Sequence, residues 1–120
     1  MEDRVRYITH KGKQILLVDL SHCKAAEVEK ISQFLPSFLA SEPRGSVLIL
    51  GDFTGAEINH KAADRIKLTA ALDRPHLKRS AWVGTESIPH VFFEAMKSFT
   101  QRDLTSFKTR EEAMEWLVKE

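Results

Sequence analysis

The stretch from Ser46 to Gly55, with the sequence SVLILGDFTG, constrains the fold of this chain more than any other. Its centre, Val47 to Leu50, is wholly apolar and shows no alternation with polar residues. Such a short apolar run is typical of a strand buried on both faces, as in a parallel sheet covered by helices. The small and polar residues from Gly51 onward are typical of a loop that leads from a strand into a helix. Since open α/β sheets bind ligands at the carboxyl ends of such strands, the stretch also predicts where a site lies.

The rest of the chain alternates between strand and helix patterns on both sides of this central strand. Five segments have the apolar pattern of strands, namely residues 5–9, 14–20, 47–50, 78–83 and 104–107. Four segments carry apolar residues at the spacings typical of helices, namely residues 28–39, 59–72, 87–99 and 109–117. The order β-β-α-β-α-β-α-β-α predicts a single α/β domain over residues 1–120. We expect a mostly parallel five-stranded sheet with one antiparallel strand, and helices packed on it.

Local signals indicate where these helices begin, end or bend. Asn59 is a plausible N-cap for the second helical segment, and Thr109 opens a capping box before the last one. Pro36 lies inside the first segment and has no N–H to donate, so we expect a kink or a weakened last turn there. Asp73 is close to the end of the second segment, because the residue before Pro75 disfavours helix.

Charge and cysteine content narrow the class of protein. The chain has 18 basic and 17 acidic residues, a formal net charge of +1, so no broad attraction to nucleic acid is expected. No apolar run approaches the roughly 20 residues that span a bilayer, and the N-terminus lacks the apolar segment of a secretory signal. Cys23 is the only cysteine, which excludes an intramolecular disulfide and fits a reducing compartment. We expect a cytoplasmic protein without stable membrane insertion.

The element order and four sequence stretches resemble the SpoIIAA-like, or STAS-like, family of small bacterial domains. The stretches are GKQILLVDLS, SVLILGDFTG, SAWVG and TREEAMEWLVK, and together with the order they cover essentially the whole chain. The family includes anti-sigma-factor antagonists and the tails of sulphate transporters, and its shape is related to that of the lipid-binding CRAL-TRIO domains. The resemblance implies a non-enzymatic regulatory or protein-interaction domain.

In the phosphorylated members of this family, an acidic residue follows the central strand and serines stand at the start of the next helix. Asp52 is similar to that acidic residue, but Asn59 stands where a serine is expected. Thr54 is the hydroxyl residue of this loop. A phosphorylation switch of the family type is therefore not expected here.

The predicted site is the rim formed by the loops at the carboxyl ends of the strands. Helix N–H groups and two carboxylates at this rim would bind a polar group on a partner protein or a small ligand. The residues of the predicted rim are Asp19, Ser21, Asp52, Thr54, Gly55, Asn59, Gly84 and Thr85.

A phospho-accepting receiver is a weaker interpretation of the same rim. Asp19, Asp52, Thr85 and Lys108 follow predicted strands in the order acid, acid, hydroxyl and lysine, as in receivers that hold Mg²⁺ near an aspartate. A receiver, however, needs a further strand and helix between its first acids and its acceptor. Structural roles in the loops are the more frequent explanation for these residues.

Other chemistry has little support in the sequence. His22 lies beside Cys23, but neither has the spacing to His60 or His90 that metal ligands show, so no metal or cofactor is expected. No credible nucleophile with its base is present, so an enzyme is not expected.

A carrier of a lipid or another small apolar ligand is the alternative function, by analogy with the CRAL-TRIO shape. The phenylalanines of the predicted helix over 87–99 and the helix containing Pro36 could leave a gap for such a ligand. The sequence leaves the identity of the partner and the formation of a homodimer open.

Overall fold

The structure is a computed structural model that describes residues 3–90, 92–94 and 104–119. Within this part of the chain, five strands form one sheet in the order β1-β2-β3-β4-β5. Their bounds are Val5–His10 for β1, Lys13–Asp19 for β2, Val47–Asp52 for β3, Leu77–Val83 for β4 and Leu104–Phe107 for β5. β1 is antiparallel to β2, and the other neighbouring strands are parallel. The predicted fold class is confirmed.

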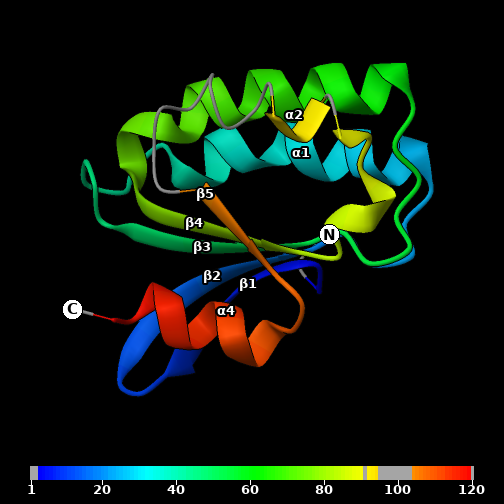
Figure 1. The fold of residues 1–120 in the computed structure, drawn as a ribbon. Helices are drawn as coiled ribbons and strands as arrows, with labels where there is room; N and C mark the ends of the chain where they lie inside the picture. The colour runs from blue at the N-terminus through cyan, green and yellow to red at the C-terminus, as the bar shows by residue number, and fades with distance from the viewer. Residues whose placement is uncertain (1–2, 91, 95–103, 120) are drawn as a thin grey trace.

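Helices cover both faces of this sheet (Figure 1). α1 (Ala25–Leu39) and α2 (His60–Asp73) lie on one face, and α4 (Arg110–Leu117) lies on the other. The short 3₁₀ helices η1 (Arg74–His76) and η2 (Thr85–Ser87) follow α2 and β4. Most of the helix predicted over residues 87–99 lies outside the described residues. The described part of that segment becomes helical at residue 90, after η2.

β2 supplies both hydrophobic cores, because successive side chains of a strand point to opposite faces. Leu16 and Val18 pack in the core under α1 and α2, whereas Ile15 and Leu17 pack in the core under α4. All four side chains are at most 4% exposed. The central strand β3 is divided in the same way, with Leu50 in the core under α4. The uninterrupted apolar runs of β2 and β3 thus reflect burial on two faces.

A proline inside α1 redirects a backbone hydrogen bond toward α2. Pro36 has no N–H, so the carbonyl of Ser32, four residues earlier, lacks its usual helical donor. The hydroxyl of Thr69 on α2 donates to this carbonyl oxygen at 2.7 Å, and the bond is buried. α1 continues past Pro36 to Leu39. A bond between two helices therefore replaces the one that Pro36 removes within α1.

We expect Thr69→Val to lower the free energy of unfolding by about 1–3 kcal/mol, because it leaves the buried Ser32 carbonyl without a donor. In a Pro36→Ala background the same change should cost about 1 kcal/mol less, since the new backbone N–H at position 36 then reaches that carbonyl. Urea unfolding of the four proteins measures this coupling. Equal costs of Thr69→Val in both backgrounds would contradict it.

Candidate functional site

Two neighbouring strands end in the same three-residue turn. The sequence is Asp-Leu-Ser at the end of β2 and Asp-Phe-Thr at the end of β3. Asp19 Oδ1 accepts hydrogen bonds from the backbone N–H of Ser21 at 3.0 Å and from its hydroxyl at 2.5 Å. Asp52 Oδ1 accepts from the N–H and hydroxyl of Thr54 at 2.9 and 2.7 Å. Aspartates commonly stabilise turns by bonding to the backbone two residues on.

The two turns lie side by side because the parallel pairing continues beyond the strands. Asp19 stands opposite Asp52 in the register of β2 and β3. Beyond them, the N–H of His22 donates to the carbonyl of Thr54 at 2.8 Å. The structure thus brings together four predicted rim residues, Asp19, Ser21, Asp52 and Thr54.

Arg110, the first residue of α4, joins the two carboxylates. Its Nε donates to Asp52 Oδ2 at 2.7 Å, and its Nη2 lies 3.3 Å from Asp19 Oδ1. Arg4 adds a second guanidinium, with Nη1 donating to the carbonyl of Ser21 at 2.9 Å and lying 3.7 Å from Asp19 Oδ1. The Asp52 side chain is only 8% exposed. Both rim carboxylates therefore already have partners within the chain.

The pKa of Asp19 reflects this network. Burial raises it, but the hydrogen bonds from Ser21 and the positive charges of Arg110 and Arg4 outweigh burial, so the pKa lies below its ordinary value. Asp19 is consequently a carboxylate at neutral pH. Its negative charge stabilises the rim through these contacts within the chain.

Two glycines allow the loops of the rim to approach closely. Gly55 has a φ of +67°, and a Cβ there would lie 2.5 Å from Nδ1 of His22. Gly84 has a φ of +70°, and a Cβ there would lie 2.3 Å from the backbone N of Thr54. Both the left-handed backbone and the contact require glycine. These two predicted rim residues hold the loops together and bring no binding group of their own.

The last two predicted rim residues take separate positions. Asn59 is the N-cap of α2, and its Oδ1 accepts from the N–H of Ala62 at 2.8 Å. Thr85 lies in η2 and is half-buried. Among the described contacts, none joins either side chain to the Asp19–Asp52–Arg110 network. Sequence reasoning missed Arg4 and Arg110, whose only signal was their place just before β1 and at the start of α4.

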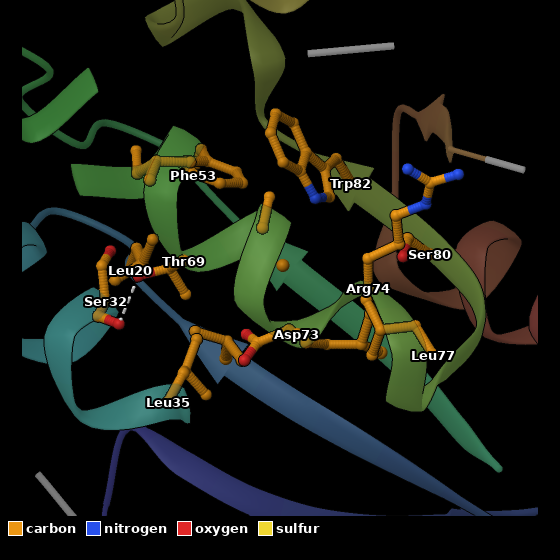
Figure 2. A pocket seen from close by; sticks show the side chains of 15 residues that line it. Leu20, Ser32, Leu35, Phe53, Thr69, Asp73, Arg74, Leu77, Ser80 and Trp82 are labelled. Carbon is orange, nitrogen blue, oxygen red and sulfur yellow. Dashed lines mark hydrogen bonds between the residues drawn. The ribbon is translucent and has the colours of Figure 1, made fainter. Parts of the chain in front are cut away.

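A cavity of about 80 Å³ lies between the sheet and the helices α1 and α2 (Figure 2). We call it the α1–α2 cavity. Most of its wall is apolar, and the larger side chains on it are Leu35, Ile49, Phe53, Ile66 and Trp82. Ser32 and Thr69, which share the hydrogen bond between the helices, also line it.

Asp73, the last residue of α2, is the acidic group on this wall. It is 3% exposed, and its Oδ1 has no hydrogen-bond partner among the described residues. Burial raises the pKa of Asp73 and the nearby His76 lowers it, with a net value of about 7. The sequence indicated Asp73 only as the end of a helix. Its surroundings had no sequence signal.

The described residues also bear on metal binding, thiol reactivity and membrane insertion. No group of three or more histidine, cysteine, aspartate and glutamate side chains among the described residues could hold a metal ion. Cys23 is buried, and burial raises the pKa of its thiol. Within the described ranges, no helix has both the length and the apolar composition needed to cross a membrane.

Comparison with known proteins extends the likeness of fold over nearly the whole chain. A family model described as SpoIIAA-like matches residues 2–118. The crystal structure of an uncharacterized protein with a SpoIIAA-like fold from Shewanella loihica is similar, with a TM-score of 0.73 and 18% sequence identity. The match covers 94% of this chain and 91% of that one. Among curated proteins, none matches this sequence significantly. At such low identity the structural likeness establishes the fold alone.

The buried carboxyl of Asp73 predicts a loss of stability as the pH rises. Its pKa is 3.8 in an unfolded chain and about 7 in the folded protein, so its contribution is complete below pH 3.8 and is lost as the pH rises through 7. Between pH 4 and pH 8 the free energy of unfolding of the wild type should fall by about 2–4 kcal/mol relative to that of Asp73→Asn. Denaturant unfolding across this range measures the difference. Asp64→Asn, an exposed change on the same helix, should follow the wild type, and equal slopes for Asp73→Asn and wild type would contradict the prediction.

Proposed function

Because this chain belongs to the SpoIIAA-like family, we propose that it acts by binding and not by catalysis, and that the α1–α2 cavity is its ligand site. The observation that carries the proposal is an apolar cavity with one buried, unpaired carboxyl oxygen on its wall. A largely apolar pocket with a few polar groups is the usual form of a small-molecule site. The ligand would be small and mainly apolar.

The energetics of the cavity favour an apolar occupant. In other proteins, cavities left in a core cost about 24 cal/mol for each Å³, because the wall loses packing contacts. A cavity of about 80 Å³ thus corresponds to about 2 kcal/mol that an apolar group could recover. The walls are the side chains of secondary-structure elements that are already packed, so they are held in place before binding.

The volume of the cavity limits the size of the ligand. An engineered apolar cavity of about 150 Å³ in another protein binds benzene, whereas the α1–α2 cavity measures about 80 Å³. A group of a few heavy atoms therefore fits without movement of α1 and α2. The occupant is a small molecule or the end of a longer one.

The predicted rim supports a second candidate function, interaction with a partner protein. The bonds of Asp52 and Asp19 to Arg110 hold the turns at the ends of β2 and β3 in fixed positions. Thr54 and Gly55 are exposed on these turns. A rigid polar surface of this kind can contact a protein without a large cost in loop ordering. The rim carboxylates themselves are already paired, and the cavity is for this reason the better supported site.

Filling the cavity should weaken ligand binding strongly. Ala70 lines the cavity from α2, and Ala70→Leu places three more carbon atoms in it. Ala71→Leu is the matched control, because Ala71 is its neighbour on the same helix and does not line the cavity. We expect 1-butanol to shift NMR signals of the cavity residues in the wild type and in Ala71→Leu. The affinity of Ala70→Leu for 1-butanol should be at least tenfold lower than that of the wild type.

Native mass spectrometry of gently purified protein gives an independent readout. A small organic molecule retained by the wild type and by Ala71→Leu, and absent from Ala70→Leu, would support the proposal. Binding of 1-butanol with equal affinity by all three proteins would mean that the cavity is not the site. No binding by the wild type would overturn the proposed function.

The rim candidate predicts a contact at Thr54. A photo-crosslinking amino acid at position 54 should form a defined adduct with one protein in the native cell, whereas the same group at the exposed Lys30 of α1 should not. The adduct should disappear when Gly55 is replaced together with the crosslinker, because the loop is then displaced. Identical adducts at positions 54 and 30 would argue against the rim as an interface. The cytoplasmic location and the formation of a homodimer stay predictions.

A further inference from the structure

We propose that the ligand of the α1–α2 cavity carries a primary ammonium group that pairs with Asp73, while its apolar stem lies against Trp82 and Phe53. This inference rests on the proposed function, since it names the chemical class of ligand for the same cavity. Figure 2 shows the Asp73 carboxyl group between Leu35 and Leu77, with the ring of Trp82 on another part of the wall.

The carboxyl group of Asp73 has one oxygen that is buried without a hydrogen bond to any described residue. Among the described residues, its Oδ1 is the buried side-chain oxygen or nitrogen that has no partner. Buried polar atoms are nearly always hydrogen-bonded, and an exception needs a specific reason. Oδ1 can accept a hydrogen bond, and no described residue of the cavity wall donates one to it. A ligand that brings an N–H donor completes this bond.

The charges around Asp73 favour a cationic donor. Asp73 ends α2, where the helix dipole disfavours a negative charge. His76 is the neighbour whose charge acts on Asp73, but its Nδ1 is engaged with the carbonyl of Glu42 at 2.8 Å. Figure 2 shows the guanidinium of Arg74 extending away from the carboxyl group.

The contrast with Asp52 makes the missing counterion clear. Asp52 is also buried, at 5% exposed, and Arg110 donates to it at 2.7 Å. Buried carboxylates are normally matched by a cation in this way. Oδ1 of Asp73 has no such donor among the described residues. An ammonium group on the ligand would supply one.

The rest of the wall suits a short apolar stem. The rings of Phe53 and Trp82 pack against each other with centroids 4.6 Å apart, and both line the cavity. Aromatic faces attract both methylene groups and ammonium groups. A cavity of about 80 Å³ holds an ammonium group and a few carbon atoms.

Three probes of equal length separate the head group from the stem. n-Butylamine, 1-butanol and n-pentane each have five heavy atoms and differ only at one end. Trp116→Phe leaves Trp82 as the only tryptophan, since the chain has two, so its fluorescence reports on the cavity. At pH 8, where the amine is charged, we expect n-butylamine to bind at least tenfold more tightly than 1-butanol.

Asp73→Asn should lower the affinity for n-butylamine at least tenfold. Its affinities for 1-butanol and n-pentane should stay unchanged. Asp64→Asn, on the exposed side of α2, controls for attraction of the amine to surface carboxylates and should change nothing. Unchanged binding of the alcohol by Asp73→Asn also shows that the variant is folded.

The outcomes separate this inference from the function on which it rests. If all three probes bind with similar affinity, or Asp73→Asn keeps its affinity for n-butylamine, the ammonium pairing is wrong and the cavity remains a ligand site. If no probe changes the fluorescence of Trp82, the cavity is not a ligand site and both proposals fall.

Discussion

The contact between Arg110 and Asp52 is the interaction on which the arrangement of this domain depends. Asp52 ends the central strand and is almost fully buried, so its carboxylate requires a cation at close range. That cation comes from the first residue of α4, 58 positions later in the chain. The pair therefore docks α4 on the face opposite α1 and α2. Through Asp19 it also fixes the end of the neighbouring strand.

This network explains why the rim and the α1–α2 cavity differ in character. At the rim, two aspartates meet two arginines, and the turns that carry them are bonded to each other. Both rim carboxylates are thus paired within the chain. In the cavity, Oδ1 of Asp73 has no hydrogen-bond partner among the described residues. In the described part of the chain, the rim thus has paired carboxylates, whereas the cavity wall has a carboxyl oxygen that can still accept a hydrogen bond.

Local pattern predicted the sheet, because apolar runs such as Val47 to Leu50 mark a strand covered on both faces. It also predicted that Asp19 and Asp52 meet, since parallel strands end at the same edge. The partners of these aspartates had no local signal, because Arg4 and Arg110 reach them only through the fold. The cavity could not be predicted from the sequence. Its volume depends on how closely the side chains of α1, α2 and the sheet fill the space between them. No residue type in the sequence indicates that such a space is left.

The bond from Thr69 to Ser32 has a consequence for how this sequence can vary over evolutionary time. The hydroxyl of Thr69 is needed only because Pro36 withholds an N–H from the same carbonyl. A relative with another residue in place of the proline has no such need, and a valine at the second position then fits as well. The two positions, 33 residues apart (69 − 36 = 33) on different helices, are expected to change together in descent, with the proline retained only where the hydroxyl is also retained.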